Sequence, residues 1–149
     1  MYHNRIIALG AAATATAAAL YAMPTASGHL QSTTLRFTNH LDTQQPVDVA
    51  PTGPSAGDSF YVSSHLVSGG TGRTAASCTV VTTADGGLKQ CEVDFILNRG
   101  TITTRALTDN ANTRVRLVVT GGTGNYAGRS GSGILTPTPT GSTVVLHLR

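Results

Sequence analysis

Apolar and polar residues alternate along several short stretches of the chain, and this period of two constrains the fold more than any other feature. The clearest stretch is 90–97, in which Cys91, Val93, Phe95 and Leu97 fall on one face and polar residues on the other. Successive side chains of a β-strand point to opposite faces, so the pattern is typical of a strand with one buried face. Beyond the N-terminal segment no stretch shows sustained helical periodicity. The sequence therefore predicts an all-β protein.

Turn-forming residues divide the chain into short strands at fairly even spacing. We expect strands at about 35–41, 58–67, 73–82, 90–97, 101–108, 114–120, 131–136 and 142–149. Residues 43–57 contain three prolines and no alternation, which predicts a long irregular connection capping one end of the fold. Pro137 and Pro139 are expected to end the seventh strand, because proline has no N–H to donate. An antiparallel meander of about eight strands can close into a barrel, which is filled by side chains or holds one small ligand.

The segment 117–131 contains five glycines, at positions 121, 122, 124, 128 and 131. A phosphate-binding loop would need lysine and then serine or threonine after its last glycine, and a dinucleotide fingerprint would need a helix to follow. Residues of strand character follow instead, at 132–135. We interpret the glycines as a tight structural corner between two strands.

The N-terminal segment has the pattern of a secretory signal peptide. One arginine, Arg5, precedes an uncharged, alanine-rich run at 6–22, and small residues at Ala26 and Gly28 precede His29. We expect a signal peptide at 1–28, a single domain at 29–149 and a secreted, extracellular protein. The alternative is a retained membrane anchor, for which the run is barely long enough.

Charge and aromatic content narrow the classes of partner. The chain has ten Lys and Arg against seven Asp and Glu, and the basic residues are scattered without interleaved aromatics. Nucleic-acid binding would need a clustered basic surface, so no nucleic acid is expected, and no membrane after the signal is removed. With no Trp and only seven Phe and Tyr residues, any cavity must be lined mainly by aliphatic side chains.

The two cysteines, Cys78 and Cys91, lie on neighbouring predicted strands. A four-residue loop at 83–86 would place them directly opposite one another, whereas a two-residue Asp85-Gly86 loop would place them diagonally on the same face. A three-residue loop would put them on opposite faces and forbid a bond. Export favours a disulfide over two free thiols, and two cysteines at this spacing do not make a metal site.

The histidines on the predicted strands suggest no catalytic triad. His40, His65 and His147 fall on three different strands, and no Gly-x-Ser-x-Gly elbow is present. We interpret each as an ordinary strand residue, Glu92 and Asp94 as solvent-facing, and expect neither a metal nor a cofactor.

Several segments in order resemble the allene oxide cyclase barrel family, whose superfamily includes the plant dirigent proteins. They are LVVTGGTGNYAGRSGSGIL at 117–135, Asn-His-Leu-Asp at 39–42 with Pro46, Gly57-Asp58, and the stretch 72–78. The resemblance covers most of the chain after the signal. It implies an eight-stranded antiparallel barrel, in agreement with the strand count.

The resemblance also implies a site. The cyclases rearrange an unstable fatty-acid epoxide in a mostly apolar lumen, where a held water stabilises the developing oxyanion. By this resemblance the water site falls on Asn39 and Pro46, with Ser64 in place of a further asparagine and Cys78 in place of a lumen cysteine. Phe37 stands where the cyclases have a glutamate. A phenyl ring supplies none of the electrostatic stabilisation that a carboxylate gives.

Two functional hypotheses follow. In the first, a lumen lined by Phe37, Asn39, Phe60 or Phe95 binds a small hydrophobic molecule and isomerises it or steers its coupling, without a cofactor and with catalytic roles for Asn39, Pro46 and Ser64. In the second, the chain is a non-catalytic lipocalin-like carrier or a structural exported barrel. Cys78 is either half of a disulfide or a free lumen thiol, and a homo-oligomer is possible.

Overall fold

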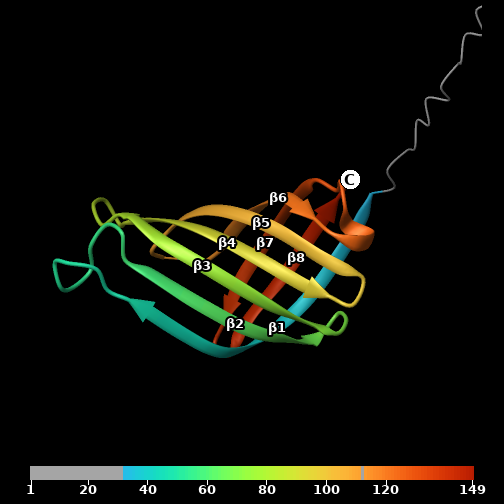
Figure 1. Cartoon of the computed structure of the whole chain (residues 1–149), viewed down its shortest axis with the longest axis horizontal. Helices are drawn as coiled ribbons and strands as arrows, with labels where there is room; N and C mark the ends of the chain where they lie inside the picture. Colours follow the sequence, from blue (N-terminus) through green and yellow to red (C-terminus); the bar gives the residue numbers. More distant parts are fainter. Residues whose placement is uncertain (1–31, 112) are drawn as a thin grey trace, which may run out of the picture.

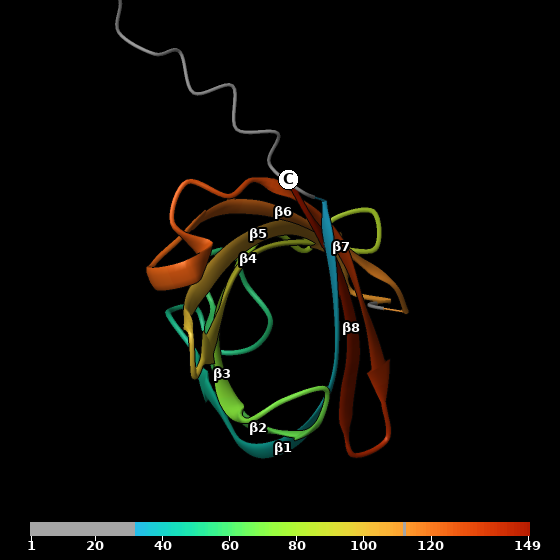
Figure 2. The ribbon, with the colours of Figure 1, turned by 90° about the vertical axis from the view of Figure 1, so that its right-hand side faces the viewer.

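A computed structural model describes residues 32–149 apart from residue 112; the signal peptide expected at 1–28 lies outside these residues. Eight antiparallel strands follow one another around a closed barrel, and β1 pairs with β8 to complete the ring (Figures 1 and 2). The predicted all-β, eight-stranded antiparallel barrel is confirmed. Within the described residues no helix is long and apolar enough to cross a membrane. The strands are β1 (Thr33–Val47), β2 (Ser59–Ser68), β3 (Gly72–Thr82), β4 (Leu88–Leu97), β5 (Gly100–Asp109), β6 (Val115–Gly122), β7 (Gly131–Thr138) and β8 (Gly141–Leu148).

Large apolar side chains fill one end of the barrel. The rings of Phe37 and Phe95 are stacked with their centroids 5.8 Å apart, and Phe95 has no exposed surface. Ile102, Leu117 and Leu146 are buried in the same apolar core. We call these five residues the plug; one of them, Leu117, also borders the cavity of the barrel. Because side chains alternate inward and outward along each strand, the period of two in the sequence predicted which residues of these strands face inward.

The glycine-rich segment between β6 and β7 packs against the β4–β5 turn and includes a short 3₁₀ helix, η1 (Gly124–Tyr126). Gly124 has a φ of +57°, and a Cβ there would lie 2.4 Å from the carbonyl oxygen of Arg99. The amides of Thr123 and Asn125 donate to the carbonyls of Thr101 and Arg99. These amides are therefore engaged within the protein, which supports the prediction of a structural corner over a phosphate-binding loop.

Two strands run further than predicted, in both cases through a proline. Residues 43–47 were expected to be irregular but continue β1, and β7 continues through Pro137 to Thr138. Beyond His40, β1 pairs only with β2, and beyond Leu135, β7 pairs only with β8. A strand with a neighbour on one side alone tolerates a residue that has no N–H. The irregular connection is therefore shorter than predicted and begins after Val47.

A β-bulge explains why the sequence did not predict that β1 continues to Val47. Asp42 has no partner in β2, whereas Leu41 pairs with Ser64 and Thr43 pairs with Ser63. One extra residue shifts the inward and outward alternation by one position. The alternation visible at 35–41 is therefore out of phase with that of 43–47.

Cys78 and Cys91 form the predicted disulfide. They are direct partners on β3 and β4, with Cα atoms 4.1 Å apart. Of the three registers considered, the structure selects the one that places them face to face, and a bulge near Val80 accommodates the turn. Both cysteines are buried in the barrel interior. The disulfide therefore faces the lumen, and Cys78 is not a free thiol.

Asp58 organises the connection between β1 and β2. One carboxylate oxygen accepts a hydrogen bond from the amide of Val49, and the other accepts one from the amide of Ser55, at 3.0 and 2.7 Å. The Ser55 hydroxyl donates to the same carboxylate. The Val49 amide first and the Ser55 amide second hold the pKa of Asp58 below its ordinary value of 3.8.

We predict that Asp58→Ala, which removes both acceptor oxygens, exposes the amides of Val49 and Ser55 to hydrogen exchange at neutral pH. Because folding lowers the pKa of Asp58, its hydrogen bonds contribute fully above pH ~4 and are lost as the pH falls through the lowered pKa. NMR-detected hydrogen exchange measures the loss of protection in the variant and, in the wild type, the loss of protection as the pH falls. The Leu41 amide, which donates to the Thr140 carbonyl, is the control and should keep its protection in the variant. Equal protection of Val49 and Ser55 in wild type and variant would contradict the assignment.

Candidate functional site

The half of the barrel opposite the plug contains a cavity of about 400 Å³ that is partly open to solvent. Phe60 and Lys89 in its wall lie at the starts of β2 and β4, next to the β1–β2 connection and the β3–β4 turn. Figure 1 shows this connection and this turn at the same end of the barrel. Residues of the β7–β8 turn, including Pro139, form part of its rim. A cavity of this size is within the range of small-molecule sites.

Most of the cavity wall is apolar. Val62, Ala76, Val93 and Val115 contribute aliphatic surface from four strands, and the Cys78–Cys91 disulfide forms a further part of the wall. Few aromatic side chains take part, as the composition predicted. Such a surface binds a ligand mainly through burial of its apolar area and through shape.

Polar side chains gather at the inner end of the cavity, next to the plug. Ser64 and Ser142 line the cavity, and the amide nitrogen of Asn39 donates to the hydroxyl of Ser142 at 3.2 Å. All three residues are buried. The amide oxygen of Asn39 is buried without a hydrogen-bond partner among the described residues.

The unpartnered oxygen of Asn39 has an energetic consequence. A buried polar atom that makes no hydrogen bond costs about 1–3 kcal/mol. Exchanging the oxygen and nitrogen of the amide would leave an N–H group without a partner instead. In either orientation, one polar atom of Asn39 is left without a partner among the described residues, next to the cavity-lining Ser142.

One charged side chain, Lys89, belongs to the cavity wall. It is the single lysine of the chain, and its ammonium group lies 5.5 Å from the centre of the Phe60 ring, which also lines the cavity. A cation over an aromatic face is held by the ring quadrupole. The cavity therefore combines a neutral polar group at its inner end with a positive charge near its opening.

The residues proposed from the sequence occupy three different places. Ser64, Phe60 and Cys78 line the cavity, and Asn39 lies directly behind it through its bond to Ser142. Pro46 is exposed at the opening side; it pairs with Phe60 but is not part of the cavity wall. Phe37 and Phe95 lie in the plug and do not line the cavity.

Among the lining residues missed at the sequence level are Lys89 and Ser142, and the period of two could have found both. Lys89 has the same parity as Cys91 and Val93, and Ser142 has the same parity as Val144 and Leu146. Both lie near strand ends, where the sequence alone does not indicate how far the inward-facing pattern extends. Polar residues there are ordinarily interpreted as turn or surface positions.

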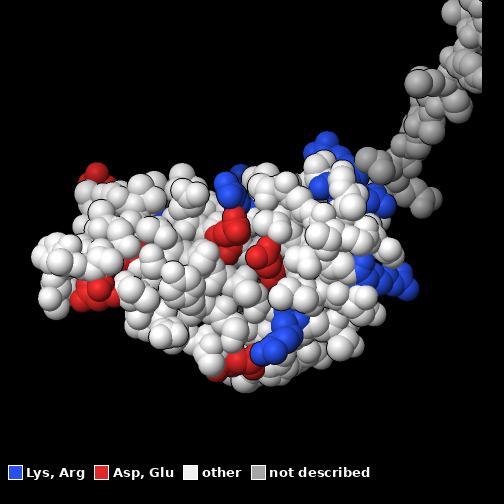
Figure 3. Space-filling model, in the orientation of Figure 1, with Lys and Arg blue, Asp and Glu red and all other residues white. Residues whose placement is uncertain are grey.

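Two acidic side chains outside the cavity, Glu92 and Asp94, contact residues of the neighbouring strand β5. Glu92 bonds Arg105 at 3.0 Å, and Asp94 accepts a hydrogen bond from Thr103. On the face drawn in Figure 3, acidic and basic side chains lie scattered, several next to one another, between broad uncharged areas. The predicted outward orientation of Glu92 and Asp94 agrees with these contacts.

No protein-family model matches the chain, and no curated protein matches it in sequence. Solved structures do match. A pyocyanin demethylase is 26% identical with a TM-score of 0.71, and the match covers 78% of this chain and all of the demethylase. The Diels–Alderase AbmU from Streptomyces koyangensis is 18% identical with a TM-score of 0.61, covering 79% of this chain and 63% of that protein.

A pterocarpan synthase dirigent protein is also similar, at 16% identity and a TM-score of 0.60, with 80% of this chain and 94% of the dirigent protein covered. At these identities the Diels–Alderase and the dirigent protein share the fold with this chain. Cyclase and dirigent barrels are thus among its structural neighbours. The fold is that of the allene oxide cyclase and dirigent-like barrels, as the sequence resemblance predicted.

Proposed function

We propose that this protein binds a small, largely apolar molecule in its cavity and either isomerises it or directs the stereochemistry of its coupling. The observation that carries the proposal is the composition of the cavity: an apolar wall, the Asn39–Ser142 pair and Ser64 at the inner end, and Lys89 near the opening. The similarity to a pyocyanin demethylase supports a small-molecule ligand.

The chemistry we propose rests on confinement and hydrogen bonding. An apolar wall that restricts a flexible substrate to one reactive conformer removes a large part of the entropic contribution to the activation barrier. An amide or hydroxyl group placed where negative charge develops stabilises the transition state. We assign this role to the hydroxyl of Ser64 and to a water that the free amide oxygen of Asn39 would hold, and assign Pro46 to shaping the opening. Phe37 supports the inner end from within the plug and takes no part in charge stabilisation.

We further propose that the protein is exported. The N-terminal pattern at 1–28 fits a signal peptide, and the Cys78–Cys91 disulfide fits an oxidising compartment. Ligand binding would then take place outside the cytoplasm.

A carrier role is the second candidate, and one observation favours it. No aspartate, glutamate or histidine lines this cavity in the part of the chain that the structure describes. Apart from Lys89, the wall therefore offers no side chain of the kinds that most often serve as general acid or base. A carrier would keep the ligand-binding features without changing the product of any reaction.

We predict that Ala76→Phe blocks ligand binding. Ala76 faces the cavity, so a phenyl ring there would occupy ligand space. The neighbouring Ala75 is exposed on the outer face, and Ala75→Phe is the matched control. Fluorescence titration with uncharged N-phenyl-1-naphthylamine should show at least ~10-fold weaker binding for Ala76→Phe alone. Equal binding by both variants would place the ligand elsewhere.

We predict that Asn39→Ala abolishes stereochemical control. An unsaturated fatty-acid allene oxide generated in situ would cyclise to a product of high enantiomeric excess with the wild type and near-racemic product with the variant. Loss of one oxyanion donor typically lowers rates about 10²–10³-fold. Chiral chromatography measures the ratio, and probe binding checks that the cavity is intact. Racemic product from both proteins would remove the catalytic role for this substrate and favour the carrier.

We predict that Lys89 selects ligands with an anionic end. Lys89→Met should weaken binding of 8-anilinonaphthalene-1-sulfonate about 5- to 30-fold, as expected for ~1–2 kcal/mol from a partly exposed charge pair. Binding of uncharged N-phenyl-1-naphthylamine should be unchanged, and Lys89→Arg should retain most of the preference. A parallel loss for both probes would indicate that Lys89 acts through packing instead.

A further inference from the structure

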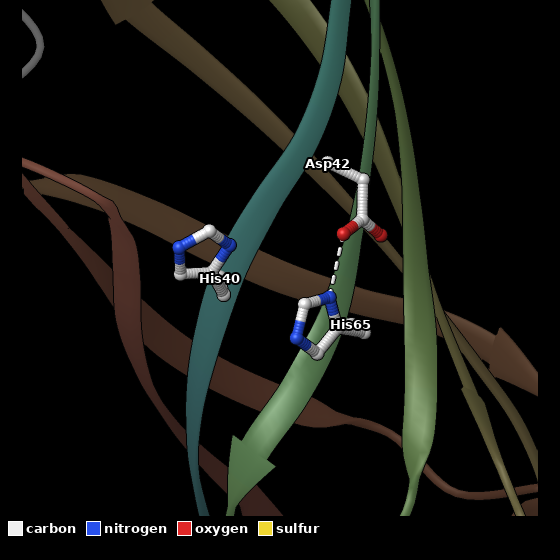
Figure 4. A group of neighbouring side chains, drawn as sticks. All are labelled: His40, Asp42 and His65. Atoms are coloured by element: carbon white, nitrogen blue, oxygen red, sulfur yellow. Dashed lines mark hydrogen bonds and ion pairs between the residues drawn. The ribbon is translucent and has the colours of Figure 1, made fainter.

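Two histidines and an aspartate gather on the outer wall of the barrel, away from the cavity. His40 and Asp42 come from β1 and His65 comes from β2, and all three are exposed (Figure 4). The Nδ1 atom of His65 lies 2.5 Å from a carboxylate oxygen of Asp42, and the imidazoles of His40 and His65 lie side by side with centroids 5.3 Å apart. One potential ligand atom from each residue lies within 4.8 Å of the other two.

The β1 bulge assembles this group. His40 and His65 are direct partners in the β1–β2 ladder, so their side chains emerge from the same face. Asp42 is the extra residue of the bulge and has no partner in β2, and its carboxylate reaches His65. In a regular ladder Asp42 would pair with Ser63, which lies two positions from His65 along β2.

We propose that His40, Asp42 and His65 bind a divalent transition metal, for which Zn²⁺ is the representative. Two imidazoles and one carboxylate are a ligand set that suits zinc, copper and nickel, whereas Ca²⁺ and Mg²⁺ prefer oxygen ligands alone. Tetrahedral zinc with bonds of about 2.0–2.1 Å needs ligand atoms some ~3.4 Å apart. Because the three side chains are exposed, rotation about their side-chain torsions brings the ligand atoms to this spacing.

The surroundings of the site set limits on it. Arg73 pairs with His65 from β3 and places a positive charge on the same face. The single carboxylate of Asp42 must therefore offset the positive charges of both the metal and Arg73. Both imidazoles must be neutral to bind the metal. Three protein ligands leave at least one coordination position open to water or to a donor from another molecule.

A metal bound here would link β1 and β2 where their ladder is irregular. Leu41 and Ser64 are direct partners and line the cavity on the inner side of the wall. Leu41 lies between His40 and Asp42 in the sequence, and Ser64 directly precedes His65. Register shifts interrupt the β1–β2 ladder on either side of the pairs formed by residues 39–41. A bound metal would link the two strands within this segment, so zinc binding should raise the thermal stability of the chain.

The test is calorimetric titration of the purified, chelator-treated chain with ZnCl₂ at neutral to slightly alkaline pH. We expect one Zn²⁺ per chain, a rise in melting temperature on saturation, and no comparable heat or stabilisation with Mg²⁺ or Ca²⁺. Absence of saturable zinc binding up to ~1 mM would overturn the proposal.

Variants locate the ion. His40→Ala, His65→Ala and Asp42→Asn should each weaken zinc binding at least ~10-fold, since even outer-shell partners of a metal contribute about 10–100-fold. His147→Ala is the matched control, because His147 is an exposed strand histidine that contacts Thr34 instead. Circular dichroism without metal confirms that each variant folds. Zinc binding that survives the His40 and His65 changes, or falls equally in the control, would place the metal elsewhere.

Discussion

The pairing of β1 with β8 is the constraint on which the rest of the structure depends. It joins Thr33 through His40 to the last strand and turns an open meander into a ring with no unpaired edge along this seam. Closure gives every strand an inside and an outside, so the alternation along the chain becomes a separation between lumen and solvent. Everything proposed for the lumen requires this separation.

The lumen is divided because the inward-facing residues differ in size along the barrel axis. Phe37, Phe95 and their neighbours fill one end, whereas Ala76, two serines and the disulfide leave space at the other. Polar atoms are placed where the two regions meet, through Asn39 and Ser142. An apolar molecule entering from the open end would therefore bring its inner part to the buried hydrogen-bonding groups of Ser64 and Ser142.

The bulge at Asp42 acts on both sides of the wall. On the inside it shifts the alternation, so that Gln44 lines the cavity although it is out of phase with Asn39 and Leu41. On the outside it brings a carboxylate to a pair of histidines. The effect on the inside follows from the period of two of a β-strand, because one extra position exchanges the faces of everything that follows. On the outside, the extra residue itself supplies the carboxylate.

The sequence by itself determined the strand class, the approximate strand limits, the inward face of each clear strand and the structural role of the glycine segment, because these are local properties of alternation and turn chemistry. It also placed the cysteines on adjacent strands but left their register open. Tertiary structure decided which end of the barrel is open, that Phe37 and Phe95 fill the other end, and that Lys89 and Ser142 reach the cavity. It also decided that His40 and His65, 25 positions apart in the chain, are neighbours. These features depend on register and on the combined volume of side chains from eight strands, and neither quantity is set within any one strand.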